Sequence, residues 1–267
     1  ATLSVSGGAS LTFSGGDDKA VTGNGWTMGD SVTFSASGDV NDIGVTLSLE
    51  LDGDTSDSPN VLDSQSIKLD FGEGGTLTFA GHGGSSAMSA VDDVMPNAYE
   101  EPWDVVTGAD AGIINGHSGN NMFTYNYSHD SGIGVTVAYL NASDAVTDVS
   151  YSDIGLTYTG IDGLTLGYAQ GDVEQTTATK SDEHTMYLKY AMGPITVGVQ
   201  SSEKDEDGGA TNDTESTGVG LTYQVNDDLS VGIGSHTIEY NSGDDQESMG
   251  FSASYTMGSL TIAGAYN

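Results

Sequence analysis

Cysteine and arginine are both absent from this chain of 267 residues, and basic residues of any kind are scarce. Without cysteine, neither a disulfide framework nor a thiolate metal site can form. Five lysines stand against 39 aspartates and glutamates, so the formal net charge is −34. Such a chain has too few cations to displace the counterions of phosphate, which excludes nucleic acid as a partner. Small cations should be attracted instead, most strongly into a cleft lined by carboxylates.

Long apolar runs are missing as well. Nowhere do 18 apolar residues follow one another, which excludes a transmembrane helix. Membrane-spanning β-strands leave a weaker, alternating signal, so a membrane protein is not excluded. No signal peptide is visible, and the start at 1–4 fits a mature end left after cleavage at a small-residue site.

Catalytic motifs are also lacking. The sequence contains no H-E-x-x-H pair, no G-x-S-x-G nucleophile elbow and no G-x-x-x-x-G-K-[ST] phosphate loop. Its histidines fall in loops or at the ends of expected strands: His82, His117, His129, His184 and His236. We therefore expect no enzymatic activity.

What the sequence does contain is an alternation of apolar and small polar residues with period 2. In 43–51, for example, every second residue is Ile, Val or Leu. Such alternation is typical of β-strands with two unlike faces, and no helical pattern longer than two turns competes with it. Fifteen strands are predicted around 3–13, 32–34, 43–51, 67–71, 77–79, 123–127, 135–139, 154–158, 164–168, 186–190, 195–199, 219–223, 229–233, 249–255 and 260–266.

The connections between these strands alternate in length. Short ones lie at 39–42, 72–75, 129–132, 160–163, 191–194, 226–228 and 256–259. Long ones lie at 15–30, 52–64, 82–120, 140–152, 170–183, 201–215 and 241–247. Short turns at one end and long loops at the other are the asymmetry of outer-membrane barrels.

Most of the short turns are preceded by a strand that ends in an aromatic residue. These residues are Phe71, Tyr127, Tyr158, Tyr190, Tyr223 and Tyr255, and the last five are 31, 32, 33 and 32 residues apart. The regular spacing predicts one height and one face for all six. In a membrane protein such a ring is an aromatic girdle at the level of the lipid headgroups.

The face opposite these apolar residues carries Gly, Ser, Thr and Ala, which suit a wide aqueous lumen; a soluble β-protein of a saline habitat could carry them too. Fifteen or more strands cannot lie in a flat open sheet, and unpaired backbone groups cannot face lipid, so the sheet must close. The prediction is a single domain over 1–267, an all-β, transmembrane, antiparallel up-and-down β-barrel. Since single-chain bacterial barrels have even strand numbers, we expect sixteen strands, the last following Tyr266.

One connection breaks the repeat. Phe71 and Tyr127 are 56 residues apart, about 24 more than one hairpin, and the excess lies in 82–120. A loop of that length in a compact domain is usually functional.

With its start Ala1-Thr-Leu-Ser-Val-Ser-Gly-Gly, its hairpin series and its long acidic third loop, the chain resembles the general porins of alphaproteobacteria, the Rhodobacter and Rhodopseudomonas type. The likeness covers the whole chain as a pattern, without a specific motif. It implies a sixteen-stranded barrel, a homotrimer, and a third loop, here 82–120, that folds inward and narrows the pore. The absence of arginine and of a terminal Phe strand departs from that family.

The resemblance also implies that loop carboxylates face basic residues across the constriction. The carboxylates would be Glu100 and Glu101 first, then Asp104, Asp92, Asp93 and Asp110. Strand parity points Lys68 and Lys189 into the lumen, whereas Lys19, Lys180 and Lys204 fall in long loops. The alternatives are a solvated surface loop for the carboxylates and structural ion pairs for the two lysines.

The expected function is that of an outer-membrane porin: a water-filled, cation-favouring channel for passive diffusion of ions and small hydrophilic solutes. Partners would be outer-membrane lipid, lipopolysaccharide and further copies of the chain, with no cofactor. Weak Ca²⁺ or Mg²⁺ binding could use Asp52, Asp54, Asp57, Asp205 and Asp207, although a solvated acidic loop explains them too. The alternative is an extracellular, acidic, β-rich structural or adhesin-like protein that binds Ca²⁺; the nine-residue repeats of such proteins are absent.

Overall fold

The computed structural model describes residues 1–13, 26–53, 61–91, 94–101, 118–141, 149–175, 180–206, 213–241 and 244–266. In these residues the chain is all-β, apart from two single turns of 3₁₀-helix, η1 (Gly72–Gly74) and η2 (Ser89–Val91). No helix there is long and apolar enough to cross a membrane. The chain forms two compact units. Unit 1 comprises Ala1–Gly84 and Ser118–Tyr125, and unit 2 comprises Ser85–His117 and Asn126–Asn267.

In unit 1, antiparallel strands follow one another in chain order. They are β1 (Thr2–Phe13), β2 (Trp26–Val40), β3 (Ile43–Asp52), β4 (Leu62–Asp70) and β5 (Thr76–His82), with the first part of β8 (Met122–Ser128) beside β5. A two-stranded ribbon joins β6 (Gly84–Ser85) to β7 (Ser118–Gly119).

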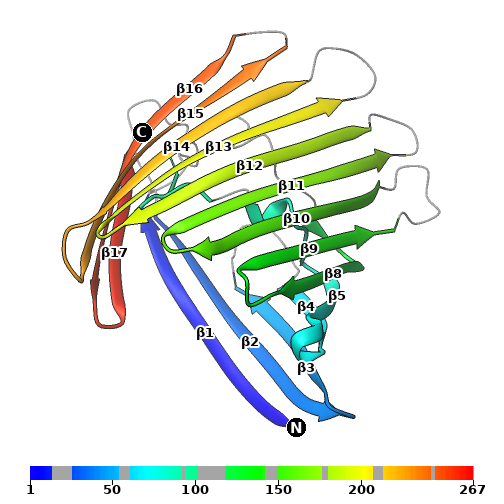
Figure 1. The fold of residues 1–267 in the computed structure, drawn as a ribbon. Helices are drawn as coiled ribbons and strands as arrows, with labels where there is room; N and C mark the ends of the chain where they lie inside the picture. The colour runs from blue at the N-terminus through cyan, green and yellow to red at the C-terminus, as the bar shows by residue number, and fades with distance from the viewer. Residues whose placement is uncertain are drawn as a thin grey trace. The chain divides into compact units, whose positions relative to one another are not determined.

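Unit 2 continues the same up-and-down order, as Figure 1 shows for its successive strands. They are β9 (Ile133–Leu140), β10 (Val149–Ile161), β11 (Leu164–Gln175), β12 (Ser181–Met192), β13 (Ile195–Glu206), β14 (Thr214–Gln224), β15 (Leu229–Tyr240), β16 (Gln246–Met257) and β17 (Leu260–Tyr266). Within the described residues the long sheet order therefore contains fifteen strands, which confirms the number and type of strands predicted from the alternation.

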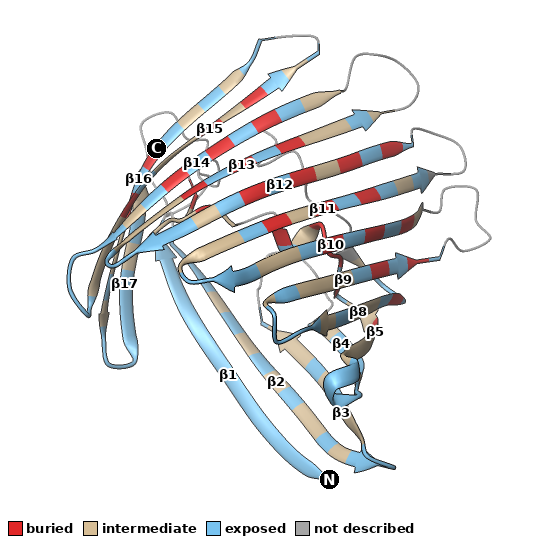
Figure 2. Cartoon of the chain, viewed as in Figure 1, coloured by how far each residue is buried: buried red, intermediate tan, exposed pale blue. Residues whose placement is uncertain are grey.

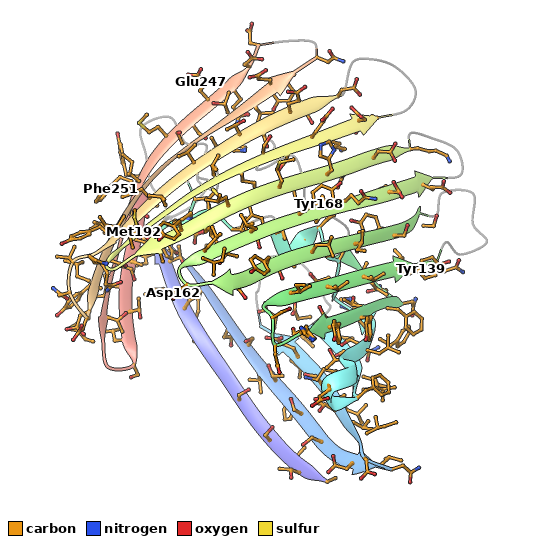
Figure 3. All side chains as sticks on the ribbon, viewed as in Figure 1. Tyr139, Asp162, Tyr168, Met192, Glu247 and Phe251 are labelled. Carbon is orange, nitrogen blue, oxygen red and sulfur yellow. The ribbon has the colours of Figure 1, made fainter. Side chains whose placement is uncertain are left out.

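The short connections are tight turns that suit their sequences. Between β2 and β3, Asn41 and Asp42 both have positive φ, +50° and +65°. Two such residues form the hairpin turn whose twist matches the strands, and Asn and Asp tolerate it best after glycine. The long connections occupy the opposite strand ends, so the predicted alternation of short and long is confirmed. In Figure 3, Asp162 and Met192 mark the short-turn end of unit 2, and Tyr139 and Glu247 the other end.

The strands extend further at their long-loop ends than the sequence predicted. Lys204, expected in a loop, lies inside β13, where it pairs with Glu183 of β12. The prediction was wrong there because apolar alternation stops before the hydrogen-bonded ladder does. Charged residues such as Asp182 and Asp205 continue the pairing beyond the last apolar position.

Burial in unit 2 is the reverse of that in a soluble sheet. On β12, Thr185 is fully buried, whereas its neighbour Met186 is 54% exposed. On β14, Ser216 is buried while Val219 and Leu221 are exposed. Figure 2 shows the same alternation of buried and exposed residues along β10 to β15. The apolar face is therefore left open and the small polar face is covered.

Successive tyrosines of unit 2 step evenly along the strands. Tyr158 of β10 and Tyr190 of β12 pair with residues of β11 that are two positions apart, with Tyr190 nearer the short turns. The same step separates Tyr190 from Tyr223 and Tyr223 from Tyr255. For these rings to share one height, the strands must tilt by about 35°, which is the tilt at which sheets close into barrels.

Candidate functional site

Part of the long third loop lies against the small polar face of unit 2. We call residues 85–91 and 94–101 the covering segment, and the strand face beneath it the covered face. Three hydrogen bonds join the two. The Met88 N–H donates to Asp153 Oδ2 of β10 over 2.7 Å, and Gln200 Nε2 of β13 donates to the Val91 carbonyl over 2.8 Å. The Ala98 N–H donates to Ser252 Oγ of β16 over 3.0 Å.

Asp153 is buried, with 5% of its surface exposed, and its carboxylate accepts three hydrogen bonds. Besides the Met88 N–H, its carboxylate accepts the Ala138 N–H and the Tyr151 hydroxyl, each over 3.0 Å. Buried charges are tolerated when several donors satisfy them, and bonds to an ionised acceptor are the stronger kind. Asp153 therefore links the covering segment to β9 and β10 at once.

Gln200 belongs to a second polar cluster on the covered face. Its Nε2 also donates to Thr185 Oγ1 over 3.1 Å, and the hydroxyls of Thr185 and Ser202 lie 2.7 Å apart. All three side chains are buried. A fully connected buried network of this kind orients its members, so Gln200 presents its amide to Val91 in a fixed position.

The two carboxylates expected first at a constriction, Glu100 and Glu101, are at the end of the covering segment. Glu100 is partly exposed and Glu101 is 5% exposed, and both take part in further interactions. Burial, and then the negative charge of Glu100, raise the pKa of the adjacent Tyr99 hydroxyl. The other expected carboxylates, Asp92, Asp93, Asp104 and Asp110, lie outside the described residues.

Of the two lysines expected in the lumen, Lys189 lies on the covered face. It lines a cavity of about 380 Å³ together with Pro96, Asn97 and three threonines of the wall. Its ammonium is 5.7 Å from the centre of the Tyr187 ring, within cation–π range. Among the described residues the lysines in ion pairs are Lys180, with Glu174, and Lys204, with Glu206, so Lys189 carries its charge without a carboxylate partner there.

Lys68 belongs to unit 1, where it lies on β4 between Thr46 of β3 and Thr78 of β5. Its side chain is exposed, like that of the apolar neighbour Ile67 on the opposite face of the strand.

The aromatic residues expected in a girdle all lie near the short turns. Phe71 precedes η1 in unit 1, and the five tyrosines of unit 2 are on the open apolar face. Tyr190, Tyr223 and Tyr255 are each about 40% exposed.

Of the residues expected to bind a metal ion, the structure describes two. Asp52 ends β3, and Asp205 lies on β13 directly opposite Asp182; Asp54, Asp57 and Asp207 lie outside the described residues. In the described part of the chain, no group of three or more His or acidic side chains could hold a metal ion.

Sequence reasoning missed the wall residues that hold the covering segment: Asp153, Gln200 and Ser252. One signal was available, since Asp153 is a charged residue at a position with the parity of the small polar face. Ser252 gave no comparable signal, because hydroxyl side chains are common on that face, and Gln200 lies just beyond the strand predicted at 195–199.

Comparisons with known proteins address the fold as a whole. The family model described as "Gram-negative porin" matches residues 1–267. No curated protein matches the sequence significantly.

Similar solved structures include OmpT of Vibrio cholerae in its trimer form, with 15% identity over 99% of this chain and 87% of that one and a TM-score of 0.70. An anion-selective porin from Comamonas acidovorans shares 18% identity over 90% and 77% of the two chains, with a TM-score of 0.67. A mutant of Rh. blastica porin shares 12% identity over 99% and 93%, with a TM-score of 0.66. At these identities the likeness establishes the porin barrel fold.

A family match over the full sequence, a porin fold and an apolar face left open to lipid agree with one another. They also agree with the resemblance to alphaproteobacterial porins read from the sequence. Porins are channels and not enzymes. This chain belongs to the Gram-negative porin family, whose members are outer-membrane β-barrels that form channels for passive diffusion.

Proposed function

We propose that the channel favours cations and that the covering segment forms its constriction. The observation that carries the proposal is the reversed burial of unit 2. The face open to its surroundings is apolar, and the small polar face is covered by a segment of the third loop. In a porin barrel the apolar face meets lipid, so the covered face is the wall of the aqueous lumen and the covering segment lies inside it.

The charge of the protein supports a preference for cations. The net charge is −34, and a lumen with low-dielectric walls concentrates counterions of the opposite sign. Glu100 is half-buried on the covering segment, where it adds to that field; Lys189 opposes it from the wall. The anion-selective relative indicates that the barrel itself does not set the sign of selectivity, so the charges of the individual chain must.

The remaining partners follow from the membrane setting. The even step of the tyrosines in unit 2 supports an aromatic girdle at one headgroup level, with Phe71 as its member in unit 1. The trimer form of the OmpT relative supports a homotrimer. Lipopolysaccharide would contact carboxylates at the long-loop strand ends on the apolar side of the sheet, such as Asp182 and Asp205. The proposal also includes weak binding of Ca²⁺ or Mg²⁺ by these carboxylates.

The charge of the covering segment is tested by Glu100→Gln combined with Glu101→Gln. Both substitutions remove a negative charge and keep the shape of the side chain, so the preference for K⁺ over Cl⁻ should fall. The reversal potential of single channels under a KCl gradient measures this directly. The preference should also weaken with rising salt, because the screening length shortens to about 10 Å at 0.1 M.

The matched control is Glu239→Gln with Glu247→Gln, two exposed carboxylates at the long-loop ends of β15 and β16. This control loses the same charge from the opposite face, so its reversal potential should stay near that of the wild type. An anion preference of the wild-type channel, or equal shifts in the two variants, would contradict the proposal.

A further inference from the structure

We propose that wall glycines, above all Gly198 and Gly220, form a seat for Pro96 and thereby set the bore of the channel. The inference rests on the proposed role of the covering segment as the constriction. It concerns wall residues that touch the segment without belonging to it.

Contact with Pro96 leaves no room for a side chain at either position. A Cβ atom at Gly198 would lie 2.5 Å from Pro96 Cδ, and one at Gly220 would lie 2.5 Å from the Pro96 carbonyl oxygen. Real Cβ atoms essentially never come closer than 3.0 Å to another heavy atom. Gly198 of β13 and Gly220 of β14 are direct cross-strand partners, so they form one flat patch under the proline.

Two further glycines continue the contact along the segment. A Cβ atom at Gly232 of β15 would lie 2.8 Å from the Ala98 nitrogen, and one at Gly155 of β10 would lie 3.1 Å from the Ala87 Cβ. All four glycines have the parity of the covered face, because each one alternates with exposed or apolar residues of the lipid-side face. The segment is therefore in contact with wall glycines of β10, β13, β14 and β15.

Backbone conformation does not explain these glycines. None of the four has the positive φ that makes glycine necessary at Gly163 or Gly258 in the short turns. In an extended strand, alanine adopts the same backbone angles, and glycine in a strand interior often marks the close approach of another backbone. The remaining explanation is space: the covering segment fits against the wall because these four residues have no side chain.

Hydrogen bonds on both sides of Pro96 keep the segment on this seat. Gln200 holds the Val91 carbonyl on one side, and Ser252 holds the Ala98 N–H on the other. Pro96 itself has a fixed φ, and the residue before it is confined to extended conformations, which makes this stretch stiff. A methyl group on the wall must then push the proline away from the wall and into the lumen.

The test is Gly220→Ala in the purified, assembled protein, with Gly264→Ala as the matched control. Gly264 is also a strand glycine, in β17, but a Cβ atom there meets nothing within 4 Å. For Gly220→Ala we expect a loss of single-channel conductance in KCl beyond the spread among wild-type channels. In vesicle-swelling assays, permeation of a disaccharide should fall more than that of a monosaccharide. Gly264→Ala should match the wild type in both.

A graded series sharpens the test. The loss should be largest for Gly198→Ala and Gly220→Ala, smaller for Gly232→Ala and smallest for Gly155→Ala, in the order of the distances above. The disaccharide-to-monosaccharide ratio separates a narrower bore from a smaller number of inserted channels, so a poorly folding variant does not imitate the effect. A rise in conductance with unchanged strand content would contradict a proline displaced into the lumen and would overturn the inference.

Equal conductance and equal sugar ratios for Gly220→Ala and Gly264→Ala would overturn the seat while leaving the channel intact. Failure of the constriction proposal has a different signature. In that case the Glu100 and Glu101 variant keeps the wild-type reversal potential, whatever the glycine variants do.

Discussion

At the residue scale, one buried carboxylate secures the start of the covering segment. Asp153 accepts hydrogen bonds from Met88, Ala138 and Tyr151, and an asparagine of the same shape would turn an N–H₂ group toward some of these donors. Each hydrogen bond to a charged group contributes about 1.5–3 kcal/mol. Asp153→Asn should therefore increase current fluctuations in single channels and lower the unfolding temperature.

The comparison for this variant is Asp162→Asn, an exposed aspartate in the turn between β10 and β11 at the opposite strand end (Figure 3). That change removes the same charge without touching the segment. If current noise and unfolding temperature are the same in both variants, Asp153 does not anchor the segment.

Sequence reasoning singled out the long third loop and missed the strand residues to which its covering segment is hydrogen-bonded. The length and acidity of 82–120 singled out the loop, because both are local properties. The bonds to Asp153, Gln200 and Ser252 join residues 65, 109 and 154 positions apart, and no periodicity encodes such pairings. The sequence does not reveal the role of the wall glycines either, because a glycine required by a close contact cannot be distinguished there from one required by a turn.

At the scale of the elements, each strand of unit 2 separates an apolar face from a small polar one. Val219 of β14 is 47% exposed and pairs with Val199 of β13, in the middle of the apolar face. In lipid, an arginine near the bilayer midplane of a barrel costs about 2–4 kcal/mol. Val219→Arg should therefore reduce the free energy of unfolding from lipid vesicles by that amount, as measured by urea titration.

Glu215→Arg provides the reference on the same strand and the same face. Glu215 is exposed, lies beyond the apolar positions and faces Glu203 and Glu239 on the neighbouring strands, so an arginine there should cost little or even stabilise. A soluble sheet would give a different result, because surface substitutions in water usually stay within about 0.5 kcal/mol. Equal, small effects for both variants would contradict a lipid-facing β14.

Strand order and strand type were predictable because the apolar alternation and the turn residues are properties of short stretches of the sequence. The alternation reports which residues face lipid, so it ends where the apolar layer ends, around Met186 on β12. The backbone ladder does not need apolar side chains and continues to Ser181. For this reason the strands and the short turns were found, and the long-loop ends, including Lys204, were misplaced.

At the scale of the whole molecule, the dominant property is the surplus of negative charge. A net charge of −34 destabilises a compact state through self-repulsion, and the repulsion is concentrated where like charges face one another. Asp172, Asp182 and Asp205 are direct partners on β11, β12 and β13, on the lipid-side face at the long-loop ends. Any cation in solution screens such a row, whereas a divalent cation can also bridge two carboxylates.

The two effects can be separated by comparing Mg²⁺ with Na⁺ at equal ionic strength. The temperature at which the assembled protein dissociates, followed by its mobility in detergent gels, should rise with either salt. With weak divalent binding the rise is larger for Mg²⁺, and a chelator removes the excess while leaving the Na⁺ effect intact. Replacing Asp182 by asparagine should reduce the difference, because it breaks the row at its centre. If the two salts give the same dissociation temperature, screening alone accounts for the effect and the divalent part of the proposal is wrong.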